Sequence, residues 1–226
     1  MLIPGLLASA RMYAAQVPQL WRAGPVMIAD HTRDDSMSGI ARRILSAAPA
    51  RFALAGLSMG GYIAFEVLRQ APQRIAKVAL LDTSARADAP EQTAMRRAQM
   101  TLASQGRLAE VVEQQFPRLV QRARRADVEL RQLFDLMAQE VGAAGFIRQQ
   151  TAILGRADSH ATLGSIRCPT LVLVGEGDEL TPPELAAEIA AGIPGARLTT
   201  VPQCGHMSTL EQPDEVTRAL LEWLEA

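Results

Sequence analysis

The segment FALAGLSMGGYIAFEVL, Phe52 to Leu68, joins two apolar runs of different period. The first run is rich in β-type residues, and the second has helical spacing. Ser58 stands between them, flanked by glycines, as in a sharp turn from a strand to a helix. Side chains at Gly56 or Gly60 would collide with neighbouring chain in such a turn. The turn would expose the Ser58 hydroxyl at the carboxyl end of the strand, where ligands of open α/β sheets bind.

Short apolar runs of the same kind recur along the chain and alternate with helical patterns. They are continuous rather than alternating, which is typical of parallel strands covered on both faces. The first four are spaced at about 25 residues, the length of a strand-helix repeat. The sequence therefore predicts an α/β fold with a mostly parallel sheet flanked by helices. The runs are Met1–Ile3, Val26–Ala29, Phe52–Ala55, Val78–Leu81, Leu171–Val174 and Leu198–Val201.

A gap of roughly 90 residues, far longer than one crossover helix, separates the fourth run from the fifth. Apolar residues recur at helical spacing within it, from Leu108 to Phe116 and from Leu130 to Val141. We therefore predict a helical cap over residues 85–166, inserted before the penultimate strand. The core of the fold would then comprise residues 1–84 and 167–226.

Composition and charge exclude several classes of protein. The 226 residues include 23 basic and 24 acidic ones, a formal net charge of −1 that recruits neither nucleic acid nor an anionic membrane. No apolar run reaches the roughly 18 residues that suggest a transmembrane helix. The first ten residues lack the basic region of a signal peptide, so we expect a cytoplasmic protein. The three histidines lie far apart and no Cys-x-x-Cys pair occurs, so we expect no metal and no cofactor.

A serine hydroxyl is a poor nucleophile and needs a base that is itself oriented by an acid. Candidates follow two later strands: Asp178 in GEGDELTPP and His206 in PQCGHMSTLEQP. Both should lie at the sheet edge that carries Ser58. The alternative is a glycine-rich turn that cradles a phosphate. A dinucleotide fingerprint needs Gly at position 58, and a P-loop needs Gly-Lys-Ser/Thr, which is missing.

Together the motifs IPGLLAS, GLSMGG, VGEGDELTP and CGHMSTLEQP resemble those of capped α/β-hydrolases, in the order nucleophile, acid, base. The resemblance implies Ser58 as nucleophile, His206 as base and Asp178 as acid. Asp82, in LLDTSAR, is an alternative acid, because some relatives supply the acid from the preceding strand. The family also implies an oxyanion hole.

That hole would be built from the backbone N–H groups of Met59 and Leu6. Many relatives have His-Gly where this chain has Pro4-Gly5, which affects the geometry of the loop more than its backbone donors. Met207 and Leu7 are candidates for the pocket wall. The basic run RLVQRARR, 118–125, is interpreted as a solvated helical face, with a dock for an anionic substrate as the alternative.

The resemblance implies a serine hydrolase that cleaves a small-molecule carboxylic ester, lactone or thioester through an acyl-enzyme. A carbon–carbon bond hydrolase, an acyltransferase or a perhydrolase would use the same three residues, and a ligand receptor on a hydrolase fold stays open. Relatives commonly carry a β-hairpin before the strand that here begins at Met1. Its apparent absence would expose the run PVMIAD as a sheet edge, through which a homodimer could form.

Overall fold

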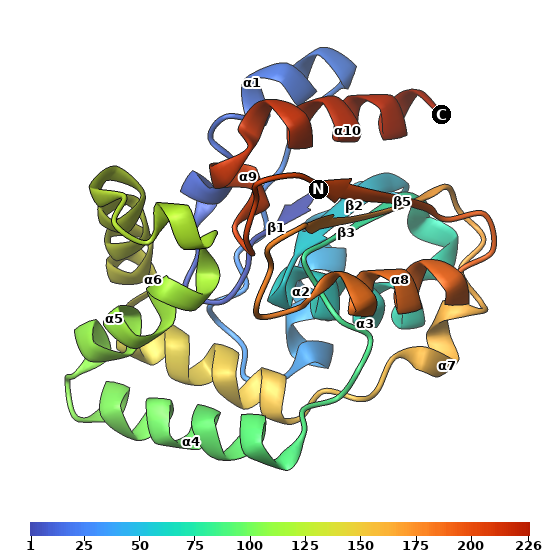
Figure 1. The fold of residues 1–226 in the computed structure, drawn as a ribbon. Helices are drawn as coiled ribbons and strands as arrows, with labels where there is room; N and C mark the ends of the chain where they lie inside the picture. The colour runs from blue at the N-terminus through green and yellow to red at the C-terminus, as the bar shows by residue number, and fades with distance from the viewer.

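The structure is a computed structural model that describes residues 1–226, with a five-stranded, all-parallel sheet at its centre (Figure 1). Neighbouring strands follow the order of the chain. This confirms the predicted α/β class. The strands are β1 (Leu2–Ile3), β2 (Phe52–Leu57), β3 (Ile75–Leu81), β4 (Thr170–Gly175) and β5 (Arg197–Val201).

The strand expected at Val26–Ala29 does not form as a regular strand. A single bridge joins Ile28 to Leu2 in the parallel sense. Two hydrogen bonds support it, from Leu2 N–H to the Met27 carbonyl at 2.8 Å and from Ala29 N–H to the Leu2 carbonyl at 2.9 Å. The partner strand β1 has only two residues, so little backbone is available for a longer ladder. A homodimer through this edge stays a prediction.

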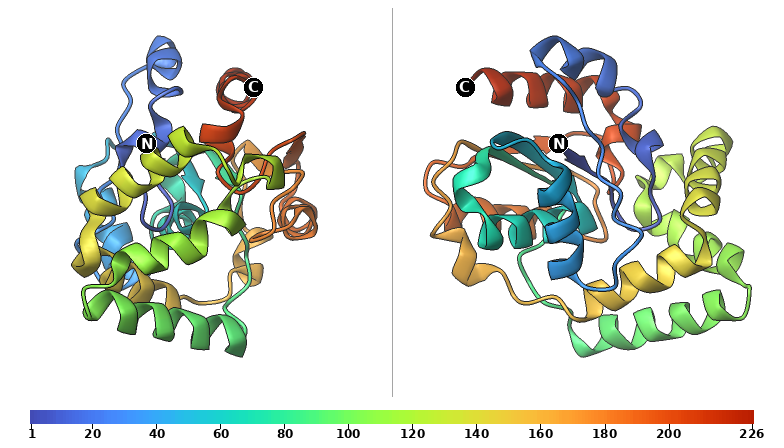
Figure 2. Two further views of the ribbon diagram at one scale, coloured as in Figure 1. Left: turned by 60° about the vertical axis from the view of Figure 1, so that its left-hand side comes forward. Right: turned by 180° about the vertical axis from the view of Figure 1, so that it is seen from behind.

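Helices cover both faces of the sheet (Figures 1 and 2). On one face lie α2 (Met37–Ala47), α3 (Met59–Gln70) and α8 (Pro183–Gly192), and on the other lie α1 (Val17–Leu20) and α10 (Pro213–Glu225). Alternate strand residues therefore enter two different cores: Leu54 and Leu80 pack toward α2 and α3, whereas Leu57 and Leu81 pack on the opposite side. Burial on both faces explains why the strand runs are continuously apolar.

A helical insertion lies between β3 and β4. It contains α4 (Pro90–Ser104), α5 (Leu108–Leu119), α6 (Val128–Leu154) and α7 (His160–Leu163), with a 3-10 turn at Arg122–Arg124. Figure 2 shows α4, α5 and α6 packed on one another beside the sheet. Helix α6 bends at Gly142, whose φ of 68° favours glycine. These helices lie within the predicted cap, although its boundaries at 85–166 stay a prediction.

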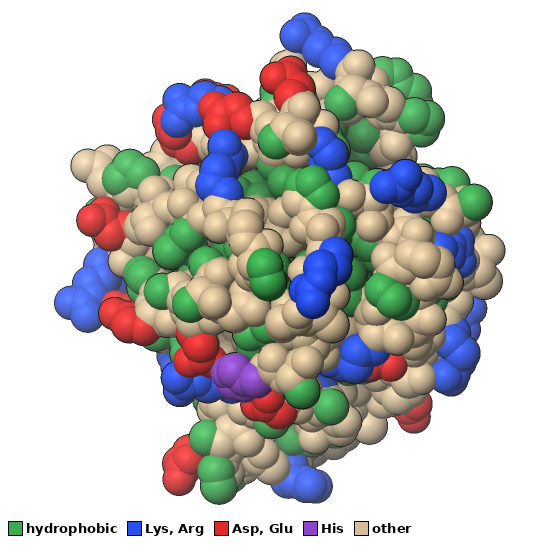
Figure 3. Space-filling view, turned by 90° about the vertical axis from the view of Figure 1, so that its right-hand side faces the viewer, with side chains coloured by type: hydrophobic (Ala, Val, Ile, Leu, Met, Phe, Trp, Pro, Cys, Tyr) green, Lys and Arg blue, Asp and Glu red, His purple; other side chains and the backbone are tan.

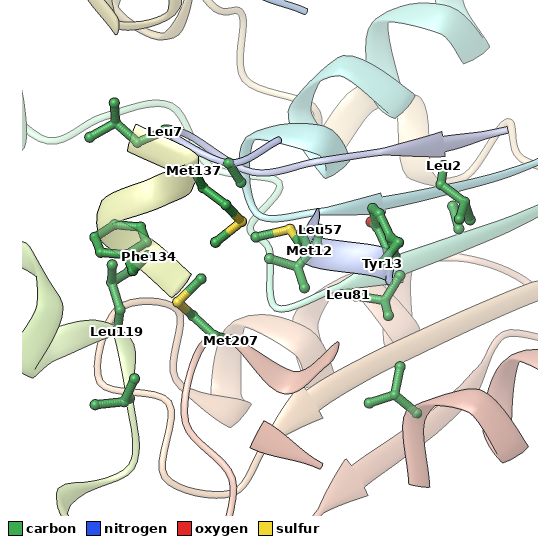
Figure 4. Packing of buried hydrophobic residues seen from close by; sticks show 14 of the residues in the cluster. Leu2, Leu7, Met12, Tyr13, Leu57, Leu81, Leu119, Phe134, Met137 and Met207 are labelled. Atoms are coloured by element: carbon green, nitrogen blue, oxygen red, sulfur yellow. The ribbon is translucent and has the colours of Figure 1, made fainter. Parts of the chain in front are cut away.

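The insertion is joined to the sheet by shared apolar packing (Figure 4). Phe134 and Met137 of α6 belong to the same buried cluster as Leu57 of β2 and Met207 of the loop after β5. Met12 and Tyr13 complete the contact from a 3-10 turn, Ala10–Tyr13. The remaining elements are short: the 3-10 turns Trp21–Ala23 and Pro72–Arg74, and helix α9 (Ser208–Glu211).

The outer surface carries charges of both signs. Figure 3 shows basic and acidic side chains dispersed over one face rather than gathered into one patch. None of the helices combines the length and the hydropathy that crossing a bilayer requires.

Candidate active site

Ser58 lies at the turn between β2 and α3, with φ 56° and ψ −114°. A residue other than glycine is strained in this region, and such strain is typical of functional turns. The flanking glycines are required sterically. A Cβ at Gly56 would lie 2.2 Å from the Gly60 carbonyl oxygen, and one at Gly60 would lie 2.2 Å from the Ile3 carbonyl oxygen. The tight packing of β1, β2 and α3 therefore fixes where the Ser58 hydroxyl stands.

His206 and Asp178 complete a chain of hydrogen bonds that begins at Ser58. His206 Nε2 lies 2.8 Å from Ser58 Oγ, and its Nδ1 lies 2.8 Å from Asp178 Oδ2. Thr181 holds Asp178 in place, donating to it from its backbone N–H at 2.9 Å and from its hydroxyl at 2.7 Å. The structure thus brings together the three residues that the sequence motifs singled out.

The electrostatics of the pair favour a charged carboxylate beside the imidazole. Burial opposes ionisation of Asp178, but the His206 charge and hydrogen bonds from His206 and Thr181 outweigh it and lower the pKa of Asp178. Burial likewise opposes protonation of His206. The adjacent Asp178 carboxylate and, more weakly, Asp82 outweigh this and raise the pKa of His206 above its ordinary value.

Asp82, the alternative acid, makes no hydrogen bond to His206. Its carboxylate accepts the Gly175 N–H at 2.9 Å and the Ser208 hydroxyl. Burial and then the charge of Asp178 raise the pKa of Asp82 well above the usual carboxyl range. Asp82 therefore links the end of β4 to the helix that follows His206, and of the two carboxylates only Asp178 hydrogen-bonds to the imidazole.

Leu6 and Met59 both line the same cavity as Ser58 and His206. The Leu6 N–H makes no hydrogen bond within the chain. Met59 is the first residue of α3, where backbone N–H groups have no partner within the helix. Two backbone donors are thus available beside the Ser58 hydroxyl.

The loop that carries Leu6 is held by two residues whose position the sequence did not reveal. Gln149 of α6 accepts the Leu7 N–H at 3.1 Å, and His31 Nε2 lies 2.8 Å from the Gly5 carbonyl oxygen. No sequence pattern indicates the role of Gln149, because its contact with Leu7 joins residues 142 positions apart. His31 is buried, and burial lowers its pKa.

Glu211 is a third residue whose position the sequence did not reveal. Its buried carboxylate accepts the N–H groups of Gly205 at 3.1 Å, Met207 at 3.2 Å and Gln121 at 2.7 Å. It thereby clamps the His206 loop to the segment that follows α5. Burial raises the pKa of this carboxyl. In the sequence, only the position of Glu211 within the motif CGHMSTLEQP, close to His206, could have indicated this role.

The cavity next to Ser58 has a volume of about 580 Å³ and lies between the sheet edge and α4, α5 and α6. Met207 lines it, as expected of a pocket residue. Leu7 does not, because its positive φ of 56° turns the chain and its side chain is fully buried in the core (Figure 4). A cavity of this size accommodates a small organic molecule.

A model of the alpha/beta hydrolase family matches residues 2–219 of this chain. The structure is similar to a thermophilic esterase from Thermogutta terrifontis, at 29% identity over 99% of this chain and 88% of that chain, with a TM-score of 0.89. An enol-lactonase from Burkholderia xenovorans shares the fold, at 22% identity over 100% of this chain and 91% of that one, with a TM-score of 0.88.

In sequence, a pimeloyl-[acyl-carrier protein] methyl ester esterase from Chromobacterium violaceum is 29% identical over 175 residues, 75% of this chain and 68% of that protein. The family match covers nearly every residue, from β1 to α10. The chain therefore belongs to the alpha/beta hydrolase family.

Proposed function

We propose that this protein is a carboxylic ester hydrolase that cleaves an ester, lactone or thioester through an acyl-enzyme on Ser58. One observation carries the proposal: the hydrogen bonds from Asp178 through His206 to Ser58 end in a cavity that two backbone N–H donors also line. Nucleophile, base, orienting acid and oxyanion donors are the parts that acyl transfer requires.

In the first half of the reaction, His206 Nε2 accepts the proton from Ser58 Oγ as the oxygen attacks the substrate carbonyl carbon. The carbonyl oxygen gains a negative charge, which the N–H groups of Leu6 and Met59 stabilise. The imidazolium then donates its proton to the leaving alcohol or thiol, and the acyl-enzyme remains. Asp178 stays ionised throughout, because its pKa is held low, and it stabilises the imidazolium.

In the second half, His206 accepts a proton from a water molecule, whose oxygen attacks the acyl carbon. The proton returns to Ser58 Oγ as the acyl–oxygen bond breaks and the carboxylic acid leaves. The likeness to an esterase at 29% identity and to a methyl ester esterase supports ester chemistry over the other reactions that use this arrangement.

Labelling with a fluorophosphonate probe tests the proposal, since the probe bonds covalently to a serine that has an active base. We expect one probe per chain, attached at Ser58, together with turnover of p-nitrophenyl esters. The Ser58→Ala variant is the control and should take up no probe. Absence of labelling in the wild-type protein would contradict the hydrolase proposal and favour a ligand receptor that has kept the hydrolase fold.

A further inference from the structure

The charged side chains that line the cavity are all arginines. Arg86, Arg96, Arg118 and Arg156 contribute to the wall, and no aspartate or glutamate does. This is unlike the chain as a whole, which has a net charge of −1, and unlike the face in Figure 3, where both signs occur. Arg86 is paired with Glu188, which does not line the cavity. The other three arginines therefore decide the charge of the cavity wall.

Two of these arginines share one carboxylate in a buried cluster. Arg96 Nε lies 2.6 Å from Asp88 Oδ2, and Arg156 Nη1 lies 2.7 Å from Asp88 Oδ1. The exposed fractions of the three side chains are only 13%, 5% and 5% for Arg96, Arg156 and Asp88. One positive charge thus remains without a carboxylate, and Arg156 Nε is buried with no hydrogen-bond partner. Buried charges and donors are normally compensated.

The cluster lies close to the nucleophile. The Arg156 guanidinium stacks on the ring of Tyr62, 4.3 Å from its centroid. Tyr62 is one helical turn beyond Ser58, and its N–H contacts the Ser58 carbonyl oxygen at 3.4 Å. A group that binds to Arg156 can therefore belong to the same small molecule as a carbonyl carbon at Ser58.

Arg118, on α5, also lines the cavity and forms no ion pair; its one side-chain hydrogen bond goes to Met95 Sδ, at 3.6 Å. In the same basic run, Arg122 and Arg125 bind Glu179, and Arg124 binds Asp127. Of the four arginines in that run, Arg118 alone keeps its guanidinium free and in the cavity wall. It is next to Leu119, whose carbonyl accepts the His206 N–H at 3.0 Å.

We propose that this cavity binds an ester or lactone that carries a carboxylate, with the carboxylate held by Arg96, Arg118 and Arg156 while the reacting carbonyl lies at Ser58. The inference rests on the proposed function and adds the class of substrate. An arginine fork matches a carboxylate in charge and in geometry, and an anion supplies the charge that Asp88 alone does not balance. A neutral ester leaves the cluster uncompensated.

The preference for a carboxylate-bearing substrate is tested by measuring the hydrolysis of monomethyl esters by the wild-type enzyme. The esters are those of succinate, glutarate, adipate, pimelate and suberate. Each is compared with the methyl ester in which a neutral primary amide replaces the free carboxylate. We expect kcat/KM to favour the charged ester by about tenfold or more for at least one chain length, as for hydrogen bonds to a charged group. Equal or lower values for the charged ester at every length would overturn the proposal.

Two variants locate the binding site. Arg118→Gln should reduce the charged-to-neutral ratio about tenfold, whereas Arg97→Gln, the same change at an exposed residue of α4 outside the cavity wall, should not change it. Both kcat/KM values come from one preparation, so a partly misfolded variant does not alter their ratio. Equal ratios in the two variants would contradict the assigned site.

Calorimetry of adipate binding to Ser58→Ala tests the anion site separately from the hydrolase proposal, because binding needs no turnover. Binding that Arg118→Gln weakens in this background supports the anion site. If adipate binds while the wild type takes no fluorophosphonate, the hydrolase proposal fails and the anion site stands. Absence of adipate binding in a protein that the probe does label would overturn the anion site alone.

Discussion

The backbone N–H of Leu7 donates a hydrogen bond to Gln149 Oε1 at 3.1 Å, joining the loop after β1 to helix α6 of the insertion. Leu7 has a φ of 56°, a strained value for leucine, so this bond stabilises a loop conformation that the chain would otherwise disfavour. The preceding residue, Leu6, carries one of the two proposed oxyanion donors. The insertion therefore supports the proposed catalytic loop in addition to covering the cavity.

We expect Gln149→Leu to lower kcat for a p-nitrophenyl ester by about tenfold, with a smaller effect on KM, because a displaced Leu6 N–H stabilises the transition state less. The control is Gln139→Leu, the same change at an exposed position of α6. Steady-state kinetics on both variants decide the matter. A kcat for Gln149→Leu within twofold of the control would show that the loop holds its shape without this bond.

The second prediction concerns which carboxylate orients His206. Asp178→Asn should lower kcat by about 10⁴-fold, because an amide cannot stabilise the imidazolium and favours the wrong tautomer. Asp82→Asn should cost far less activity, since Asp82 contacts Gly175 and Ser208 rather than the imidazole. The two kcat values are compared in proteins whose circular dichroism spectra match. The reverse ranking would move the acid to the end of β3.

The sequence located Ser58, Asp178 and His206 well because each follows a strand, and the carboxyl ends of parallel strands share one edge of the sheet. It left Asp82 open as the acid, because Asp82 and Asp178 both follow strands and only side-chain geometry separates them. The distance of 2.8 Å from Asp178 Oδ2 to His206 Nδ1 makes that distinction.

The contacts that the sequence could not predict are mainly those between the helical insertion and the rest of the chain. The Gln149 contact and the arginine cluster around Asp88 join segments whose relation no short-range pattern encodes. The apolar run Val26–Ala29 looked like a full strand, but the length of a ladder is also set by its partner, and β1 has two residues. Hydrophobicity alone carries no information about that partner.

The third prediction is the pH dependence of kcat/KM. His206 must be neutral to accept the Ser58 proton, and its pKa is raised above the ordinary value of 6.5. Activity should therefore fall as the pH drops through the raised pKa of the folded enzyme, and should be full above it. The acid limb should lie above pH 6.5. In Asp178→Asn the limb should move to lower pH, because the main cause of the raised pKa is removed.

A pH–rate profile of the wild type and of Asp178→Asn, measured with a neutral ester, checks this. The neutral substrate is needed so that titration of a substrate carboxylate does not enter the profile. A wild-type limb below pH 6.5, or a limb that does not move in the variant, would contradict the assignment of the base and its acid.

The last prediction concerns the stability of the turn that carries Ser58. A Cβ at Gly60 would lie 2.2 Å from the Ile3 carbonyl oxygen, which is backbone and has no flexible side chain to move aside. Gly60→Ala must therefore displace α3 from β1, and we expect it to lower the free energy of unfolding by about 3 kcal/mol. The matched control is Gly164→Ala, since no atom lies within 4 Å of a Cβ there and the φ of −64° at Gly164 suits alanine.

The control change should alter the free energy of unfolding by less than about 0.5 kcal/mol. Urea unfolding followed by circular dichroism measures both variants. Equal stability of the two would mean that β1 and α3 are less closely packed around the Ser58 turn than the structure shows.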